Sequence, residues 1–346
     1  MKQIYSEIFQ FRGSHYDFGY EQGRQLKDSL TIQNRKKHWK IRKPRFSINV
    51  YDTKDKFMQY APNMWAELEG LRDGLELPME EVLRDFGGYR TAITKSGCSI
   101  MTEEDYMIRN YDYQPQTYEG RYTLFKPTDG GYAVIGPTSR VTGRMDGMNE
   151  EGLVMAYNFT HRKSPEDGFV CYMIGRIILD TCANVDHAVQ LLKEIPHRNA
   201  FSYILLDPNG KTYVVETSPR GVHVRSSNVC TNHFEYLTKE NRHHLEDSYK
   251  RKEAINLQRE SNMSAKEAFR LMNDSGRGVF SHKYKSWAGT IHTSAYFPKQ
   301  REAWFALGGD AEPVKFSFDS WLKGEDIAFN KIEGEVDTDL SFAHMD

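Results

Sequence analysis

Cys98 stands in a short segment that gathers several groups capable of chemistry. Gly97 precedes it, and Arg109 and Asp112 follow. Residues 93–100 and 106–111 have the pattern of two strands of a hairpin, because the polar residues 102–105 fit a turn between them. This turn places Cys98 opposite Arg109, and directly opposed side chains share one face about 5 Å apart. We therefore expect the guanidinium to favour a Cys98 thiolate, with Asp112 at the mouth of the hairpin.

The spacing alone leaves two other interpretations open. In the first, Cys98 is an ordinary buried cysteine beside an exposed strand arginine. In the second, the intact chain is a Cys–His thiol hydrolase, because His233 lies 135 residues after Cys98 and Asn232 precedes it directly. Ser99 occupies the place where a papain-type site has an aromatic residue, which argues against this second interpretation. The sequence has no P-loop, nucleophile-elbow, HExxH or GxGxxG pattern.

Composition excludes several classes of function. The 46 Lys and Arg residues nearly balance the 48 Asp and Glu residues of this 346-residue chain, so a nucleic-acid partner is not expected. The longest apolar stretches, such as residues 153–157, have the length of strands and predict no membrane-spanning helix. The first residues lack the apolar centre of a secretory signal. We therefore expect a cytoplasmic protein in which Cys171, Cys182 and Cys230 are reduced and packed.

The elements that must position these groups change in kind along the chain. Helical patterns dominate the first 90 residues, at 16–30, 54–71 and 79–86. From about residue 91, short strands with turns between them predominate. The chain then predicts strands at 133–135, 140–148, 153–159, 202–206, 212–216, 290–296 and 303–307, and helices at 169–181, 186–194, 247–258 and from Ser264, where Ser264 and Glu267 form a capping box. Hairpins that flank paired helices indicate an α+β fold of antiparallel sheets covered by helices.

Five blocks in order resemble the cysteine N-terminal-nucleophile (Ntn) hydrolases. Gly97-Cys98 with residues 109–112 (Arg-Asn-Tyr-Asp) is similar to the family's opening. Residues 147–153 with 157–159, residues 231–234, residues 247–251 and the hairpin 290–307 resemble the later blocks. The family includes choloylglycine hydrolase, penicillin V acylase and the isopenicillin-N acyltransferase group. Residues 13–23 look like the leader of the acyltransferase branch.

The resemblance implies a fold and a way of maturing. The fold would be a four-layer αββα sandwich with a helical leader packed on it. The chain would cut itself between Gly97 and Cys98. Residues 1–97 would then form a leader subunit and residues 98–346 a catalytic subunit, and the two would stay associated.

It also implies a role for each site residue. The new α-amino group of Cys98 would take the thiol proton, as in N-terminal Thr nucleophiles. Asp112 would orient this amino group, and Arg109 would stabilise the thiolate. Asn158 would donate to the oxyanion with help from Asn232. Arg251 would organise the far side of the site, with Arg242 and Arg259 as neighbouring alternatives.

The function that follows is hydrolysis of a linear, non-peptide amide in an N-acyl small molecule through an acyl-enzyme on Cys98. Transfer of the acyl group to an amine is the first alternative. The intact-chain hydrolase using His233 and a non-catalytic binding protein are the others. No metal or organic cofactor is expected, and the oligomeric state is open, with a homo-oligomer among the options.

Overall fold

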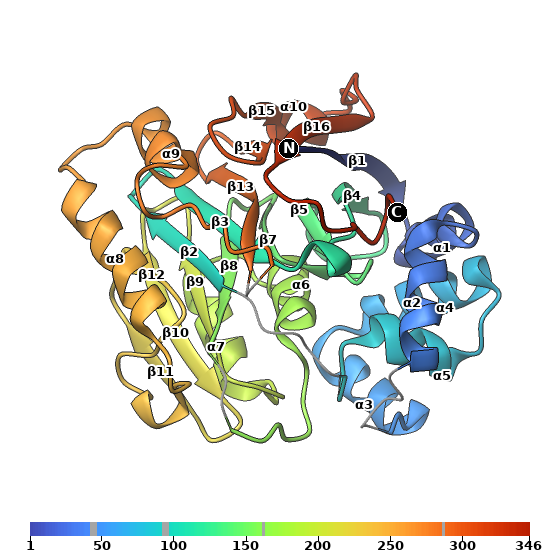
Figure 1. The fold of residues 1–346 in the computed structure, drawn as a ribbon. Coiled ribbons are helices and arrows are strands. Elements are labelled where there is room, and N and C mark those ends of the chain that lie inside the picture. The colour runs from blue at the N-terminus through green and yellow to red at the C-terminus, as the bar shows by residue number, and fades with distance from the viewer. Residues whose placement is uncertain (42–46, 92–96, 161–162, 286–287) are drawn as a thin grey trace.

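Two β-sheets lie face to face in the computed structural model, which describes residues 1–41, 47–91, 97–160, 163–285 and 288–346 (Figure 1). The first sheet has ten strands in the order β11-β10-β9-β8-β7-β5-β4-β1-β16, with β6 paired to β5. Every described pair in it is antiparallel except β1 with β4, which is parallel. The strands are β1 (Lys2–Gly13), β4 (Arg121–Pro127), β5 (Val134–Ser139), β6 (Gly143–Arg144), β7 (Asp146–Asn149), β8 (Val154–Phe159), β9 (Phe201–Leu206), β10 (Thr212–Ser218), β11 (Gly221–Arg225) and β16 (Lys331–Val336).

The second sheet has six strands in the order β12-β2-β3-β13-β14-β15, all antiparallel. Its inner face packs on the inner face of the first sheet through buried side chains such as Ile100, Ile204 and Phe305. Its strands are β2 (Gly97–Thr102), β3 (Met107–Tyr113), β12 (Val229–Cys230), β13 (Gly289–Phe297), β14 (Glu302–Leu307) and β15 (Val314–Ser317).

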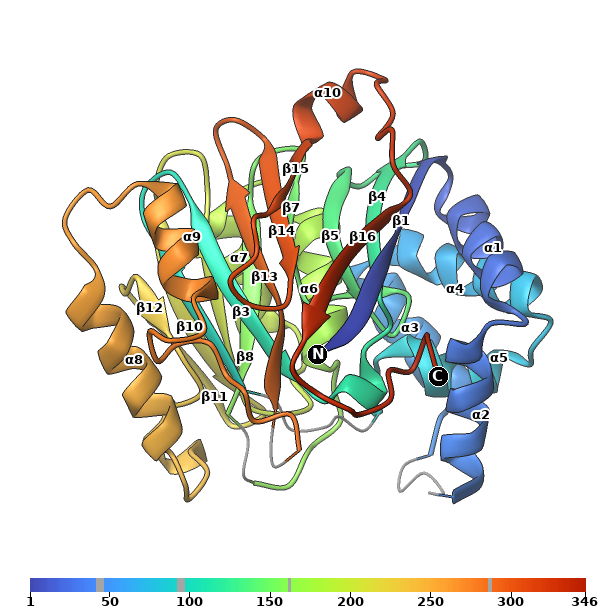
Figure 2. The same cartoon turned by 45° about the horizontal axis from the view of Figure 1, so that its top comes forward.

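Helices cover the outer face of each sheet. On the first sheet, α6 (Cys171–Thr181) and α7 (Val185–Glu194) bury Ile174 and Leu192 against Leu205 of β9. On the second sheet, α8 (Glu246–Gln258) and α9 (Ala265–Asn273) bury Ile255 and Phe269 in a cluster of their own. Figure 2 shows the resulting order of layers, helix–sheet–sheet–helix. The four-layer α+β sandwich predicted from the sequence is confirmed.

The first 97 residues contribute helices and also a strand that the sequence analysis did not predict. β1 buries Ile4 and Ser6, leaves most of its other side chains half-buried, and lies between β4 and β16. The predicted helix at 54–71 is two helices, because Pro62, which has no N–H to donate, begins the second one. The helices of this part are α1 (His15–Leu26), α2 (Leu30–Ile41), α3 (Val50–Tyr60), α4 (Pro62–Leu75) and α5 (Met79–Val82), which continues into a π-helical turn at Leu83–Gly87.

Glycines allow α1 and α4 to pack backbone against backbone. A Cβ atom at Gly19 would lie 1.9 Å from the carbonyl oxygen of Glu67, and one at Gly70 would lie 2.0 Å from that of Tyr16. Any larger residue would force the two helices apart. The glycines within residues 13–23 therefore have a structural reason.

The predicted register of the hairpin that carries Cys98 is wrong by two residues. Cys98 lies opposite Tyr111, and Arg109 lies opposite Ile100. The turn closes at Glu103, whose N–H donates to the carbonyl of Tyr106. A shift of two preserves the face of every side chain, so Cys98 and Arg109 still point to the same side. Residues 93–96 of the predicted strand lie outside the described residues.

The predicted strand at 140–148 is also wrong, because it is two short strands, β6 and β7. Arg140 and Val141 adopt left-handed backbone conformations with φ of 53° and 65°, which a strand cannot accommodate. The other predicted hairpins are present as β7–β8, β9–β10 and β13–β14. The capping box of Ser264 and Glu267 begins α9 as predicted.

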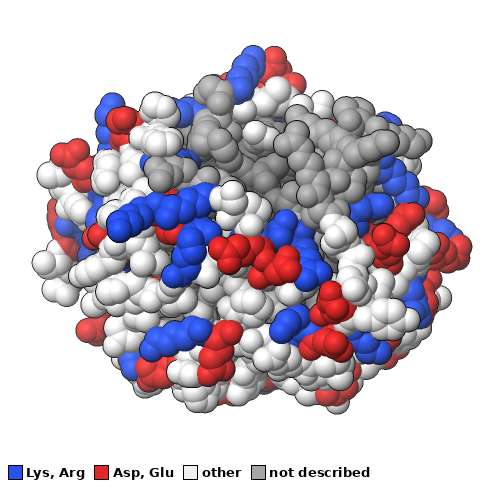
Figure 3. All heavy atoms as spheres, turned by 90° about the horizontal axis from the view of Figure 1, so that it is seen from below, with Lys and Arg blue, Asp and Glu red and all other residues white. Residues whose placement is uncertain are grey.

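The surface carries both signs of charge. Figure 3 shows Lys and Arg side chains interspersed with Asp and Glu over one face. Among the helices of the described residues, none combines the length and apolar character required to cross a bilayer.

His15 ties the start of α1 to the rest of the fold through two carboxylates. Its Nδ1 lies 2.7 Å from Asp129 Oδ1 and its Nε2 lies 3.1 Å from Asp180 Oδ1. Arg176, paired with Glu67 at 2.8 Å, also faces this group. Burial opposes protonation of His15, but the hydrogen bond and charge of Asp180 outweigh it and raise its pKa. The buried imidazole is therefore stabilised as a cation.

We expect the stability that His15 contributes to be present in full below its unfolded pKa of about 6.5 and to be lost as the pH rises through its raised folded pKa. His15→Asn should cost about 2 kcal/mol of unfolding free energy at pH 6, because hydrogen bonds to charged groups are lost. The difference in melting temperature between the two proteins should shrink towards pH 9. His187→Asn, at an exposed position on α7, is the control. Parallel melting curves for wild type and His15→Asn across this range would contradict the assignment.

Candidate active site around Cys98

Cys98 lies one residue inside β2 and points into the space between the sheets. Its side chain is 1% exposed. The Sγ atom lies 3.4 Å from Nη2 of Arg109 and 4.0 Å from the carbonyl oxygen of Asp112. Burial raises the pKa of the Cys98 thiol, and the attraction of Arg109 for the thiolate does not overcome it. The expected thiolate is therefore not favoured in the continuous chain, where the thiol holds its proton.

Arg109 is fully buried and its charge is neutralised across the gap between the sheets. One guanidinium nitrogen pairs with Asp146 of β7, and Nη2 donates to the carbonyl of Tyr157 on β8 at 2.9 Å. The guanidinium also lies 4.7 Å from the centre of the Tyr111 ring. Burial by itself would raise the pKa of Asp146, but Arg109 and the hydrogen bonds of its other neighbours lower it to about 2. The pair is therefore ionised throughout the physiological range.

Asp112 lies on the other face of β3, towards the helices. Its Oδ1 accepts a hydrogen bond of 2.6 Å from the hydroxyl of Thr290 on β13, and its Oδ2 lies 3.8 Å from Nη1 of Arg251. Burial raises the pKa of Asp112 to about 7 even though Arg251 opposes the shift. This carboxyl can therefore gain or lose a proton near neutral pH.

The backbone of Cys98 is held by two side chains at a place where a strand partner is missing. β12 pairs Val229 with Met101 and Cys230 with Ile100, and then ends. Continuing this register by two residues places Asn232 opposite Cys98. At this position the side chain of Asn232 replaces the backbone partner, and its Oδ1 accepts a hydrogen bond of 2.7 Å from the Cys98 N–H.

Arg251 completes this arrangement from α8. Its Nη1 donates to the carbonyl of Cys98 at 2.6 Å, and its Nη2 donates to Oδ1 of Asn232 at 2.8 Å. Arg259, one of the two alternatives, pairs with Glu103 at 2.5 Å instead. Between Arg251 and Arg259, it is therefore Arg251 that contacts the backbone of Cys98. It lies at the centre of the site rather than at its far side.

Asn158 faces the second sheet from β8 but bonds to the backbone that leads to Asn232. Its Nδ2 donates to the carbonyls of Cys230 at 2.9 Å and Thr231 at 3.2 Å. Its Oδ1 is buried without a hydrogen-bond partner among the described residues. The structure thus joins Cys98, Arg109, Asp112, Asn232 and Arg251 through direct contacts and places Asn158 beside the segment that holds Asn232.

His233 makes contacts that do not fit a role as the base for Cys98. Its Nδ1 lies 2.8 Å from Oγ of Ser248 and 3.3 Å from Oγ1 of Thr231, and its ring packs on Tyr249. Burial lowers its pKa to about 4. No hydrogen bond joins it to Cys98 in the part of the chain that the structure describes.

Sequence reasoning missed three residues that support the site. Asp146 neutralises Arg109, Thr290 holds Asp112, and Ser248 accepts from the N–H of Asn232 at 2.7 Å. A signal existed for Asp146, because a lone carboxylate within an apolar strand pattern must find a buried partner. Thr290 and Ser248 carry no such signal, since threonine and serine are common in strands and at helix starts. Over the described ranges, no group of three or more His, Cys, Asp or Glu side chains is arranged to hold a metal ion.

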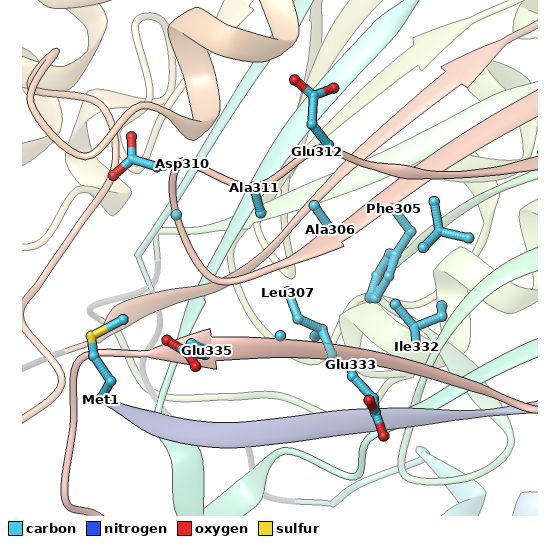
Figure 4. A pocket seen from close by; sticks show the side chains of 13 residues that line it. Met1, Phe305, Ala306, Leu307, Asp310, Ala311, Glu312, Ile332, Glu333 and Glu335 are labelled. Atoms are coloured by element: carbon cyan, nitrogen blue, oxygen red, sulfur yellow. The ribbon is translucent and has the colours of Figure 1, made fainter.

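A separate surface cavity of about 220 Å³ lies between β14 and β16. Figure 4 shows Phe305 and Ile332 within it and carboxylates around it, from Asp310, Glu312 and Glu333 among others. None of the six predicted site residues lines this cavity. It is therefore distinct from the site around Cys98.

Comparison with known proteins adds the following. The model of the family described as acyl-coenzyme A:6-aminopenicillanic acid acyl-transferase matches residues 100–312. This range contains every predicted site residue except Gly97 and Cys98, which lie just before it. The predicted resemblance to the acyltransferase branch is therefore confirmed. No curated protein matches the chain.

Several solved structures are similar to this chain at low identity. A conjugated bile acid hydrolase from Clostridium perfringens is 16% identical, covers 72% of this chain and 100% of its own, and has a TM-score of 0.48. Penicillin V acylase from Agrobacterium tumefaciens is 16% identical over 63% and 84% of the two chains, with a TM-score of 0.44. A Caenorhabditis elegans ortholog of N-acylethanolamine-hydrolyzing acid amidase is 10% identical over 59% and 93%, with a TM-score of 0.40.

The raised pKa of Asp112 makes a prediction about stability. Its unfolded pKa is about 3.9, so the stability associated with the protonated carboxyl is lost as the pH rises through the folded value of about 7. Asp112→Asn keeps the shape and removes the charge. We expect the melting temperature of this variant to rise relative to wild type between pH 5 and pH 8. Glu104→Gln, in the exposed turn of the same hairpin, should show no such trend. If the difference in melting temperature between Asp112→Asn and wild type stays constant with pH, Asp112 is not a buried carboxyl that titrates in this range.

Proposed function

We propose that this chain, which belongs to the acyl-coenzyme A:6-aminopenicillanic acid acyl-transferase family, is a cysteine amidohydrolase that activates itself by cutting the bond between Gly97 and Cys98. One observation carries the proposal. The backbone nitrogen and oxygen of Cys98 are held by side chains, those of Asn232 and Arg251, while its thiol lies on Arg109. In a cut chain that nitrogen becomes the α-amino group, and the Asn232 side chain would already hold it beside the thiol.

Self-cleavage would begin with attack of the Cys98 sulfur on the carbonyl carbon of Gly97. The bond from that carbon to the Cys98 nitrogen breaks, a thioester forms, and the proton of the thiol passes to the departing nitrogen. Water then hydrolyses the thioester, which leaves a carboxylate on Gly97 and a free thiol and α-amino group on Cys98. Gly97 offers the least steric resistance to this attack. Asp112 lies opposite Gly97 in the hairpin and carries an exchangeable proton near neutral pH.

Turnover would use the new α-amino group as the base. Its reference pKa of about 7.7–8.0 leaves a useful neutral fraction at pH 7. It accepts the thiol proton, the thiolate attacks the amide carbonyl of the substrate, and the amine leaves with that proton. Water then releases the acyl group from Cys98. Asn232 and Arg251 would keep the nitrogen in place, and Arg109 would stabilise the thiolate.

The oxyanion of the tetrahedral intermediate needs a hydrogen-bond donor, and such a donor contributes about 10²–10³ in rate. Asn158 is the proposed donor, with assistance from Asn232. In the continuous chain the Nδ2 of Asn158 is bonded to the carbonyls of Cys230 and Thr231. Donation to substrate therefore requires this amide to be redirected after the cut, when the Cys98 nitrogen is no longer tethered to Gly97.

The leader would remain bound after the cut. β1 is hydrogen-bonded along both edges, to β4 on one side and β16 on the other. Loss of residues 1–97 would therefore split the first sheet and expose its core. A two-subunit protein made of residues 1–97 and 98–346 is the expected mature form.

Hydrolysis of a linear amide in an N-acyl small molecule is the proposed reaction, and transfer of the acyl group to an amine is the alternative. The two differ only in the molecule that attacks the acyl-enzyme. The name of the matching family supports the transferase, since it describes an acyl-transferase. A cytoplasmic location remains a prediction from the sequence. The oligomeric state stays open, with a homo-oligomer among the options.

Intact-mass analysis tests the proposal most directly. Purified wild-type protein should give two chains of 97 and 249 residues, the larger beginning at Cys98. Cys98→Ala should give one uncut chain and no release of amine from a panel of N-acyl amides. Cys182→Ala, at another buried cysteine, should cleave and turn over like wild type. An uncut wild-type chain with full amidase activity would refute self-activation, and a cut chain that is inert on every amide would favour a binding protein.

His233 separates the proposed mechanism from the intact-chain alternative. Because its Nδ1 is engaged by Ser248 and Thr231, His233→Asn should retain both cleavage and at least about a tenth of wild-type turnover. Loss of turnover by more than about 10²-fold, with the chain uncut in wild type as well, is the result that a Cys–His hydrolase would give. Mass and initial-rate measurements on the same preparation decide between the two.

A further inference from the structure

We propose that Tyr118 and His292 are positioning residues for the nucleophile, and that Ser6 of the leader strand β1 is the far end of the same buried chain. The inference rests on the proposed function of Cys98. It assigns to the leader a contribution to the site beyond holding the first sheet together.

The chain runs through consecutive polar contacts from the leader to the carboxylate behind Arg109. Ser6 Oγ lies 3.1 Å from the hydroxyl of Tyr118, which lies 3.2 Å from Nδ1 of His292. On the other side of the ring, Nε2 of His292 lies 3.8 Å from Oδ2 of Asp146, an electrostatic contact longer than a hydrogen bond. Asp146 pairs with Arg109, whose other nitrogen contacts the thiol. Strands β1 and β7 of the first sheet are thus connected with β13, β3 and β2 of the second.

Burial gives these contacts their strength. The side chains of Ser6, His292 and Asp146 are 0% exposed and that of Tyr118 is 1% exposed. Water therefore does not compete for their hydrogen bonds, and each polar group depends on the partner that the fold supplies. Rotation of one of these side chains alone would leave the next one without its polar partner.

His292 also supports the site through its ring. It stacks on Tyr111 with ring centres 4.9 Å apart and planes 13° apart. Tyr111 lies directly opposite Cys98 in the hairpin, and the Arg109 guanidinium lies over the same Tyr111 ring. The orientation of His292 is therefore linked to Arg109 by two routes, through Asp146 and through Tyr111.

The charges around His292 determine which nitrogen carries its proton. Burial lowers the pKa of His292, so the ring is neutral and has a single N–H. The carboxylate of Asp146 faces Nε2, and an N–H directed at a carboxylate is far more stable there than a lone pair. Nδ1 is then an acceptor, so the Tyr118 hydroxyl donates to it. The Tyr118 oxygen in turn accepts from Ser6. The donors of Ser6, Tyr118 and His292 therefore all point towards Asp146.

The consequence is that the Tyr118 hydroxyl, in contact with Ser6 of the leader, fixes the orientation of a histidine that faces the counterion of Arg109. Loss of the Tyr118 hydroxyl leaves Nδ1 of His292 without its donor, so the ring is no longer held on that side. Asp146, which also contacts Arg109 and Tyr296, then shifts with the ring that faces it. The guanidinium follows its carboxylate, and its distance to the thiol changes. Chemistry at Cys98 should suffer while substrate binding does not.

Tyr118→Phe tests this in the full chain. We expect self-cleavage and kcat to fall about 3- to 10-fold with KM within a factor of two, because one buried hydrogen bond contributes about 1 kcal/mol. Ser6→Ala should give a smaller loss of the same kind. Ser6→Ala should then have no further effect in the Tyr118→Phe background, because the two side chains act through one chain. Tyr106→Phe is the matched control, since it removes a buried hydroxyl that donates to the Met263 carbonyl elsewhere.

The outcomes separate failure of this inference from failure of the proposed function. If wild type neither cleaves nor turns over amides, the function is wrong. If wild type is active and Tyr118→Phe resembles Tyr106→Phe, or if the losses of Ser6→Ala and Tyr118→Phe simply add, the positioning chain is refuted. Melting temperatures of all variants identify a folding defect, and Ser6→Ala, the smallest change, then remains to decide the question.

Discussion

A guanidinium buried between two sheets is the constraint on which the rest of the site depends. Arg109 has no water to solvate it, so its charge requires a carboxylate and carbonyl acceptors within reach. Asp146 and the Tyr157 carbonyl supply them, and both belong to the opposite sheet. The ion pair thereby fixes how the sheets face each other at the level of Cys98. The thiol occupies the remaining side of the same guanidinium.

Shared contacts also explain why the first part of the chain, the proposed leader, is not a separate domain. β1 lies inside the first sheet, and glycine-to-backbone contacts join α1 to α4 within the leader. His15 then binds carboxylates on the catalytic side of the proposed cut. A break at Gly97–Cys98 would interrupt the covalent chain without interrupting any of these contacts. The two chains produced by the proposed cut would therefore remain one folded unit.

Much of the fold and of the candidate site could be predicted from the sequence, and the exceptions have physical reasons. The hairpins and the outer helices follow local turn and periodicity signals, and ordered blocks identified Cys98, Asn232 and Arg251. The register of the Cys98 hairpin depends on where its turn closes, which several polar residues between 102 and 106 could satisfy. β1 was missed because its pairing partners lie more than a hundred residues away. The partnership of Asp146 with Arg109 likewise exists only in three dimensions.

The pattern of contacts around Cys98 distinguishes two kinds of thiol chemistry. A site of the Cys–His type needs a base within hydrogen-bond reach of the sulfur. Here the neighbour of the sulfur is a permanently charged arginine, which cannot accept a proton at any relevant pH. The specialised acceptor faces the backbone nitrogen instead, where β12 ends early and the Asn232 side chain replaces a strand. A fold that gives up strand pairing to hold this nitrogen favours chemistry in which the nitrogen itself takes the proton.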